Sequence, residues 1–358
     1  MPTLPKSSKK KAMTLMPLEL RSLPHRRLEA WKWTDVQGRV SDGQKGLSVS
    51  ALPHFDLPEG VSVSEVDGDD LRTDTPMADL ARQLGGKVWQ IDIADGQVAG
   101  TVSIGNLMKG HSRIRINISK GAKLNLIEHY AGEAGAFSNL DLTIKMGKGA
   151  QLSRVIIHDD PADHVRVATT HISAWAEAQI TQHVLSFGGA LSRLETRLAA
   201  MGRTVNATLN GAYLLSDKRH ADMTSYIDLT SEDCTIRQSV KGVVTDKARG
   251  VFQGKFHVRR PAQHTDAEMR HDALMLSDSS EIRSKPELEI YADDVACAHG
   301  NTLGQLDESA LFYMRQRGIP AAQARALLTE AFLAEAFDDM ADEDLQESLL
   351  GKVRAWLG

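Results

Sequence analysis

Apolar and polar residues alternate with a period of two along most of the chain from about residue 88. Such alternation places every second side chain of a strand in a core, so each stretch predicts a half-buried β-strand. No apolar stretch with the length and period of a helix interrupts these strands, which argues against a sheet with crossover helices. Strands are predicted within residues 113–118, 123–127, 140–146, 165–172, 221–229, 234–244, 250–258 and 281–292.

A short motif recurs in this region with a nearly fixed step. Its copies are Gly121-Ala122-Lys123-Leu124, then Gly149-Ala150-Gln151-Leu152 and Glu177-Ala178-Gln179-Ile180 at steps of 28 residues, and Ala207-Thr208-Leu209 after 29 more. Ile116, Ile144 and Ile172 keep the 28-residue step. A constant step is typical of a solenoid, because each coil presents similar residues to the next. The pattern predicts a right-handed parallel β-helix over residues 86–305, whereas a β-sandwich, the alternative, does not usually repeat one motif in register.

The first 85 residues lack this alternation and predict an irregular or weakly helical N-terminal region. Residues 23–36 favour a short helix in which Trp31 and Trp33 anchor the segment, because paired tryptophans more often fill a core than bind a ligand. Residues 37–75 are rich in Gly, Ser, Asp and Pro and predict a linker with little structure of its own. Residues 78–84 favour one or two helical turns.

A basic cluster precedes a short apolar stretch near the N-terminus, as at the opening of a signal peptide. Pro17 and Glu19 interrupt the apolar residues 13–20, and no small-residue cleavage site follows them. We therefore expect a frayed tail on a cytoplasmic protein. No run of about 18 apolar residues occurs, so no membrane-spanning helix is expected. The basic residues are Lys6, Lys9, Lys10 and Lys11.

The pattern becomes helical from residue 306 onward. Asp307 suits the cap of a first helix, and Gly318 suits its end. We expect this C-terminal helical domain, residues 306–358, either to cap the solenoid or to present a surface to another chain. Helices are predicted over residues 308–317, 321–340 and 342–357, the second with an apolar face of Ala324, Leu327, Leu328, Ala331, Phe332 and Phe337.

Charge and composition exclude several classes of function. The formal charge of -5 is spread over a mixed-sign surface and gives no reason to expect nucleic acid or an anionic membrane as a partner. Two cysteines make no disulfide framework, so a reducing compartment is the simplest interpretation. Neither the phosphate-binding motif G-x-x-x-x-G-K-S/T nor the nucleophile motif G-x-S-x-G occurs.

The chain has 13 histidines, several of them in or beside predicted strands. A single histidine in such a place is more often an exposed residue or a hydrogen-bonded turn residue than a ligand. We apply that interpretation to His158, His171, His183, His220, His257, His264 and His271.

Cys297 and His299 are the exception, because they lie two residues apart just after a predicted strand. On an extended segment their side chains leave from one face and can converge on one metal ion or one sulfur species. Thiolate and imidazole are ligands that iron and zinc accept, and two ligands leave room for those of another chain. The alternative is a buried structural thiol beside a turn histidine.

Three strings of residues are specific enough to compare with known families: P-E-L-E-I-Y-A-D-D-V-x-C-x-H-G-x-T-x-G at 286–304, F-Y-x-x-x-R-G-I at 312–319 and E-A-W-K-W-T at 29–34. Together they resemble the SufD family of the Suf iron-sulfur cluster assembly system, over most of the chain. SufB-like sequences tend to have Glu where this chain has Gly300. The resemblance implies a non-catalytic scaffold subunit that pairs with a SufB-like paralogue and binds a SufC-type ATPase, with sulfur supplied by a cysteine desulfurase system.

The resemblance also implies roles for individual residues. His299, with Cys297 as the weaker candidate, would help to assemble a transient iron-sulfur cluster shared with the partner, and a flavin on the complex would be one source of electrons. The heterodimer contact would involve Pro286, Leu288, Ile290, Tyr291 and His299. The ATPase would dock on Leu311, Phe312, Met314, Arg317, Gly318, Ile319, Leu327 and Phe332.

Two other functions stay open at this point. A β-helix carbohydrate-active enzyme would need a groove lined with acids and aromatic residues, yet the chain has five Trp and five Tyr, and Asp293-Asp294 lacks a basic cluster to bind an acidic sugar. A self-contained metal-binding solenoid would need no partner. Because the last strand leaves N–H and C=O groups unpaired, we expect an edge-to-edge homodimer when the chain is expressed alone.

Overall fold

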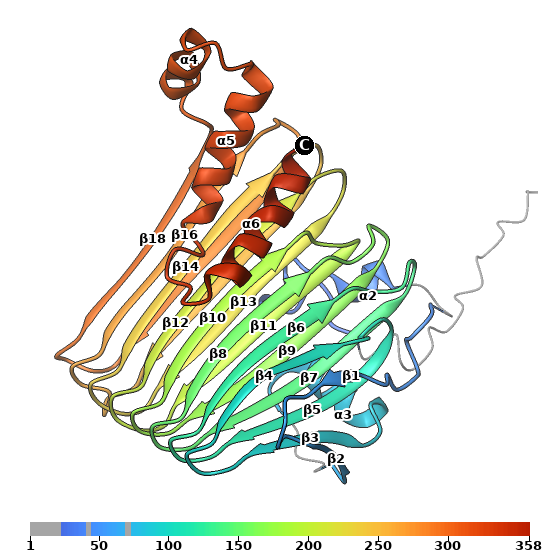
Figure 1. Cartoon of the computed structure of the whole chain (residues 1–358), viewed down its shortest axis with the longest axis vertical. Helices are drawn as coiled ribbons and strands as arrows, with labels where there is room; N and C mark the ends of the chain where they lie inside the picture. The colour runs from blue at the N-terminus through green and yellow to red at the C-terminus, as the bar shows by residue number, and fades with distance from the viewer. Residues whose placement is uncertain (1–22, 41–43, 69–72) are drawn as a thin grey trace, which may run out of the picture.

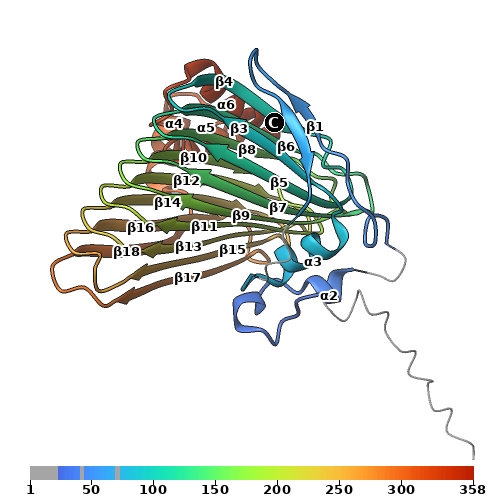
Figure 2. The ribbon, with the colours of Figure 1, turned by 90° about the horizontal axis from the view of Figure 1, so that it is seen from below.

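Strands β3 to β18 wind into a parallel β-solenoid whose coils add strands to two nine-stranded sheets (Figure 1). The computed structural model describes residues 23–40, 44–68 and 73–358. Figure 2 shows the turns that join the two sheets along one side of the solenoid. The predicted parallel solenoid is therefore confirmed.

Each sheet consists of alternate strands of the chain, completed by one short antiparallel strand. The even sheet, in spatial order, is β1 (His54–Asp56), β4 (Val98–Gly105), β6 (Lys123–Tyr130), β8 (Gln151–His158), β10 (Gln179–Ser186), β12 (Asn206–Leu215), β14 (Thr235–Val244), β16 (Asp266–Met275) and β18 (Ala296–Gly304). The odd sheet is β2 (Val63–Val66), β3 (Val88–Ile93), β5 (Gly110–Ile118), β7 (Phe137–Met146), β9 (Val165–Ala174), β11 (Leu191–Ala200), β13 (His220–Leu229), β15 (Arg249–Val258) and β17 (Glu281–Ile290).

The predicted 28-residue step is the register between β6, β8 and β10 in the even sheet and between β5, β7 and β9 in the odd sheet. The next step differs from the prediction, because Ile180 pairs with Ala207 and not with Leu209. The turns that join the strands differ in length, so the register here is shifted by two residues. Because side chains alternate along a strand, a shift by two residues leaves the same side chains facing inward. The stacks that follow the predicted step are Lys123, Gln151 and Gln179 in the even sheet and Ile116, Ile144 and Ile172 in the odd sheet.

One corner of the solenoid has a left-handed backbone in every coil from Gly96 to His264. Gly121 and Gly149 have φ angles of 64° and 65°, and Glu177 takes the same position with a φ of 63°. Glycine adopts this conformation without a steric cost, whereas a residue with a Cβ is strained there. Stacking of the coils therefore imposes on Glu177 a conformation that its two predecessors adopt freely.

Two short strands extend the two sheets at the N-terminal end of the solenoid, and a helix packs on the outer face of the odd sheet. β1 pairs antiparallel with β4, and β2 pairs antiparallel with β3. Both lie in the stretch predicted to be an unstructured linker, so that prediction is wrong. The first coil has two free strand edges. Residues 54–56 and 63–66 pair with these edges and form strands, although the composition of residues 37–75 disfavours strands. α3 (Pro76–Leu84) confirms the predicted helical turns.

The segment around Trp31 packs on the outer face of the odd sheet. A single helix over residues 23–36 is not formed, and the chain has the 3-10 turn η1 (Glu29–Trp31) and the short α2 (Val36–Arg39) in its place. Trp31 is 3% exposed, and the guanidinium of Arg193 lies 4.0 Å from its ring centroid. The packing role predicted for Trp31 is confirmed. The basic cluster and the predicted tail, within residues 1–22, lie outside the described residues.

The C-terminal helices α5 (Ala321–Ala334) and α6 (Glu343–Leu357) lie on the outer face of the even sheet (Figure 1). They do not cap the open end of the solenoid. α4 (Glu308–Gln316) stands apart from the sheet at the end of the solenoid where β18 lies (Figure 1). The buried contact is made by Leu333, Ala336, Phe337, Leu349 and Val353 on Val155, Ile157, Leu185, Phe187, Ala212, Leu214, Val243 and Leu274.

α5 ends at Ala334, and the prediction that it continues to Met340 is wrong. Asp339 accepts hydrogen bonds from His183 at 2.8 Å and from Asn210 at 3.0 Å, both on the even sheet. These contacts hold residues 335–340 against the sheet as turns, which overrides their helical propensity.

Other details of the helical domain agree only in part with the sequence pattern. The Asp307 side chain accepts a hydrogen bond from the backbone of Ser309, and Gly318 follows α4 with a φ of 84°, so both predicted helix boundaries are confirmed. The predicted apolar face is confirmed for Ala324 and Phe337, which are fully buried, but it is wrong for Leu327, which is 43% exposed. Thr329, which the prediction left out, is buried. None of the described helices is long and apolar enough to cross a membrane.

Candidate functional site

The last coil of the solenoid, β17 and β18, has an open edge. Among the described residues β17 pairs only with β15, and β18 pairs only with β16. Nearly all residues of β18 are exposed for this reason. The interior of the solenoid is thus uncovered at this end, opposite the end where β1 and β2 extend the sheets (Figure 2).

Cys297, His299 and Asn301 share the inner face of β18, since their register partners Ala267, Met269 and His271 are buried in the interior. The structure therefore brings Cys297 and His299 to one face, as their spacing predicts. Cys297 packs half-buried against the core, and burial raises the pKa of its thiol. His299 is exposed. The neutral thiol is a poorer iron ligand than the thiolate, so His299 is the stronger candidate.

The residues predicted for the heterodimer contact follow the same edge. Pro286, Leu288 and Ile290 lie on the inner face of β17, opposite β18. Proline suits a terminal strand because it has no N–H to donate to a neighbour. Ile290 is 42% exposed, and Tyr291, just after the strand, is 61% exposed.

The last coil offers an incomplete ligand set for a metal. Within the described residues no group of three or more His, Cys, Asp and Glu side chains is placed to hold a metal ion. Cys297 and His299 are therefore at most two ligands of a site. The other free cysteine, Cys234, is buried with its sulfur beside backbone carbonyls, and burial raises the pKa of that thiol as well.

The residues predicted to dock an ATPase do not form one continuous exposed face. Phe312 and Tyr313 on α4 are 63% and 60% exposed, and the guanidinium of Arg317 donates to the Tyr313 hydroxyl at 2.8 Å. On α5, Leu327 is 43% exposed. Of the others, Leu311 is buried, Met314, Ile319 and Phe332 are half-buried, and Gly318 is exposed.

Lys241 fixes α5 to the even sheet. Its ammonium lies 2.6 Å from Glu335 of the helical domain and 3.1 Å from Asp272 of β16. It also lies 4.8 Å from the ring centroid of Phe332. Apolar packing and a half-buried ion pair therefore hold α5 on the solenoid, and α4 projects from this fixed helix.

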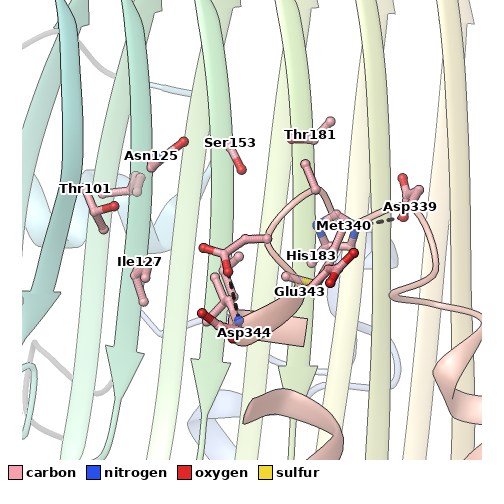
Figure 3. Close-up of a pocket in the computed structure, with 15 residues that line it drawn as sticks. Thr101, Asn125, Ile127, Ser153, Thr181, His183, Asp339, Met340, Glu343 and Asp344 are labelled. Carbon is pink, nitrogen blue, oxygen red and sulfur yellow. Dashed lines mark hydrogen bonds and ion pairs between the residues drawn. The ribbon is translucent and has the colours of Figure 1, made fainter. Parts of the chain in front are cut away.

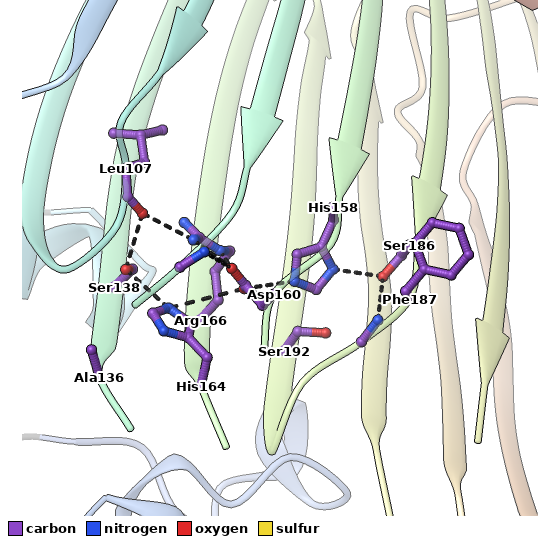
Figure 4. A network of polar contacts seen from close by, with 12 residues as sticks. Leu107, Ala136, Ser138, His158, Asp160, His164, Arg166, Ser186, Phe187 and Ser192 are labelled. Atoms are coloured by element: carbon purple, nitrogen blue, oxygen red, sulfur yellow. Dashed lines mark hydrogen bonds and ion pairs between the residues drawn. The ribbon is translucent and has the colours of Figure 1, made fainter. Parts of the chain in front are cut away.

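A buried network around Asp160 joins neighbouring coils, and the sequence pattern did not reveal it (Figure 4). Arg166 donates to both carboxylate oxygens at 2.6 and 2.8 Å, and His158 Nε2 lies 2.7 Å from Oδ2. All three side chains are at most 1% exposed. His158 was expected to be exposed or in a turn, and this is wrong, as it is for the buried His183, His220 and His271. Apart from Asp160, which lies two residues from His158, the hydrogen-bond partners of these histidines come from other coils, from the N-terminal segment or from the helical domain. The sequence next to each histidine therefore does not indicate these partners.

Ser186, His158 and Asp160 are hydrogen-bonded in the order Ser–His–Asp of a hydrolase triad, but the ring nitrogens are exchanged, because Ser186 Oγ lies 2.7 Å from Nδ1 and Asp160 lies 2.7 Å from Nε2. The serine, however, is fully buried. Both carboxylate oxygens also bind Arg166 (Figure 4). A substrate has no access to this hydroxyl, so the arrangement stabilises the fold and does not point to a hydrolase.

A groove of about 690 Å³ lies between the even sheet and the start of α6 (Figure 3). Its wall is acidic, but Asp342 caps α6, and Glu343 and Asp344 occupy the first helical turn. Carboxylates at these positions stabilise the helix dipole. The acids thus have a structural explanation, and the groove gives no reason to assign chemistry to it. Its floor includes an in-register polar row of Thr101, Asn125, Ser153 and Thr181.

Known proteins match this chain over most of its length. The family model described as SUF system FeS cluster assembly, SufBD core domain, matches residues 102–332. The iron-sulfur cluster assembly protein SufD of Escherichia coli is 27% identical over 92% of this chain and 88% of its own length. An iron-sulfur cluster assembly SufBD family protein of Synechocystis is 26% identical over 91% of this chain and 86% of its own length. SufD of Bacillus subtilis is 31% identical over 31% of this chain and 26% of its own length. This chain therefore belongs to the SufBD family of iron-sulfur cluster assembly proteins, and within that family it is of the SufD type.

Proposed function

We propose that this chain is a non-catalytic scaffold subunit on which iron-sulfur clusters are assembled together with a SufB-like partner. The observation that supports this best is the open last coil, which carries Cys297 and His299 on its inner face. Thiolates and imidazoles bind cluster iron, and a cluster needs more than two ligands. The partner would supply the remaining ligands, a cysteine desulfurase system would supply sulfur, and the finished cluster would leave as cargo.

Backbone pairing explains why a partner would meet this edge. β17 and β18 expose N–H and C=O groups that an added strand can satisfy, so each sheet would continue into the partner. Ile290 and Leu303, which are 42% and 54% exposed on the inner face, would then be buried. A second copy of the chain presents the same edge, so a homodimer would form when the partner is absent.

We place the contact with a SufC-type ATPase on α4 and the start of α5. Phe312 and Tyr313 expose large aromatic surfaces on a helix that projects from the solenoid (Figure 1). Aromatic residues with arginine nearby are typical of the energetically dominant centres of protein interfaces. Leu311 and Phe332, which the resemblance also implied, are turned toward the protein and would support this surface from beneath.

Replacing His299 with alanine is expected to lower the cluster content of the purified complex about tenfold, because an iron ligand is lost. The side chain is exposed, so the fold and the pairing should survive. Iron and acid-labile sulfide per complex, after co-expression with both partner subunits, are the measurement.

His54 provides the matched control for this experiment. It is an exposed histidine on β1, at the opposite end of the even sheet. H54A should leave the cluster content unchanged. An undiminished cluster content in H299A would remove His299 from the site.

The double substitution Phe312→Ala with Tyr313→Ala is expected to abolish recovery of the ATPase in a pull-down, since each side chain is a candidate for about 2 kcal/mol of binding. Both are mostly exposed, so the melting temperature should not change. Trp175→Ala, at a 53% exposed residue on a solenoid turn, is the control. Undiminished recovery with the double variant would contradict the docking surface.

Point variants test this contact better than removal of residues 308–358. That deletion would strip α5 and α6 from the even sheet and expose a buried apolar cluster. Loss of ATPase binding after such a deletion would therefore report misfolding as readily as a lost contact.

A further inference from the structure

A buried hydrogen-bonded chain leads from the middle of the solenoid to the open last coil. The hydroxyl of Tyr213 on β12 lies 2.9 Å from His271 Nε2 on β16. On the other side of that ring, His271 Nδ1 lies 2.8 Å from Asn301 Oδ1 on β18. Tyr213 and His271 are fully buried, whereas Asn301 is exposed at the open end.

Glycines make room for this chain of contacts. A Cβ at Gly242 or Gly250 would lie 2.2 or 2.5 Å from the ring of Tyr213, so the phenol can cross β14 and reach β16 only because both are glycine. The His271 ring stacks on Phe252 with a centroid distance of 4.8 Å and an interplanar angle of 9°. The imidazole is therefore held in one orientation.

The proton positions follow from the partners. Burial raises the pKa of Tyr213, so its hydroxyl keeps its proton, and among the described residues the hydroxyl has one hydrogen-bond partner, His271 Nε2. A buried hydroxyl left without an acceptor is unfavourable, so Tyr213 donates to Nε2. Burial lowers the pKa of His271 to about 4, and the neutral ring then carries its single proton on Nδ1. Nδ1 donates to Asn301 Oδ1.

This direction fixes the amide of Asn301. Because its oxygen accepts from His271 inside the solenoid, its NH₂ group must point away from that contact, toward the open end. Asn301 is two residues from His299 on the same inner face, a spacing of roughly 6.6 Å along a strand. The open coil thus presents an imidazole and, beside it, two oriented N–H donors.

We propose that Asn301 is a binding residue of the open coil that donates a hydrogen bond to an anionic sulfur held beside His299. The inference rests on the proposed function, since it assigns a further contact in the same site. Sulfide and thiolate accept such hydrogen bonds, and N–H donors to cluster sulfurs control the stability and potential of clusters. Tyr213 and His271 act as positioning residues that orient the amide.

The first test uses the isolated full-length chain and needs no cluster. Nitrogen chemical shifts of His271 should show the Nδ1–H tautomer in the unaltered protein and a mixture of tautomers in Tyr213→Phe, which lacks the hydroxyl. An Nε2–H tautomer in the unaltered protein would overturn the assignment, because the amide oxygen would then have no donor.

The second test uses the co-expressed complex. Asn301→Asp keeps the size of the side chain but replaces the donors with a carboxylate, and it should shorten the lifetime of the cluster about tenfold. Tyr213→Phe should act in the same direction but more weakly, and Tyr213→Phe with Asn301→Asp should be no worse than Asn301→Asp alone. Asn125→Asp, the same change at an exposed position on the outer face of β6, is the control and should have no effect.

The two sources of anionic sulfur are separable. If Asn301→Asp weakens pairing with the partner before any cluster is loaded, the acceptor is a thiolate of the partner. If it affects only the loaded complex, the acceptor is a sulfide of the cluster. Either result supports the hydrogen bond.

His299→Ala separates failure of this inference from failure of the proposed function. If H299A lowers the cluster content while Asn301→Asp behaves like Asn125→Asp, only the role of Asn301 is overturned. If H299A changes nothing, the proposed function and this inference both fall.

Discussion

Replacing Asp160 with asparagine is expected to lower the free energy of unfolding by about 3–5 kcal/mol, because it leaves the buried guanidinium of Arg166 without its counter-charge. Burial alone would raise the pKa of the Asp160 carboxyl, but Arg166 and His158 lower it well below its usual range. The backbone N–H of Gly132 also donates to this carboxylate at 2.6 Å. An amide has the same shape but turns an NH₂ group toward these donors.

Urea unfolding of the isolated chain, followed by circular dichroism, measures this effect. Asp163→Asn is the matched control, since Asp163 is an exposed aspartate in the same turn and should change stability by less than about 0.5 kcal/mol. A loss below about 1 kcal/mol in Asp160→Asn would show that the network contributes little to stability.

Lysine at both Ile290 and Leu303 is expected to weaken pairing with the proposed SufB-like partner about 100-fold or more. Both side chains lie on the inner faces of the last coil and are partly exposed in the isolated chain. Pairing would bury apolar area worth roughly 25 cal/mol per Å², and a lysine adds a charge that is unfavourable to bury. A loss of about 3 kcal/mol corresponds to roughly 100-fold in the dissociation constant.

The dissociation constant of the purified subunits, measured by sedimentation or calorimetry, tests this prediction. Leu52→Lys with Val98→Lys is the control, because these residues are 69% and 72% exposed near the opposite end of the solenoid. The same substitutions at Ile290 and Leu303 should suppress the homodimer proposed for the isolated chain. Pairing that withstands both lysines would mean that the contact lies elsewhere.

Much of the fold could be predicted because its signals are local. Period-two alternation and the corner motif at Gly121, Gly149 and Glu177 depend on residues within one coil, and each coil contacts mainly its neighbours. Pairing of β1 and β2 could not be predicted in this way, because their order comes from free strand edges on the first coil.

The residues of the candidate site could likewise be predicted only where their placement depends on local sequence. The spacing of Cys297 and His299 placed both on one face, since strand parity is a local property. Asn301 has the same parity, but its importance depends on His271 and Tyr213, which lie two strands or more away in the chain. No pattern of residue types near Asn301 indicates which way its amide points.

By itself the sequence determined the solenoid, the position of the open last coil and the pair Cys297 and His299, because backbone parity and the coil repeat depend on neighbouring residues. Only the tertiary structure decided that α5 and α6 cover the even sheet, that Asp160 is buried as a carboxylate, and that Asn301 turns its N–H donors outward. The physical reason is that burial of a polar group depends on partners that folding brings from distant coils.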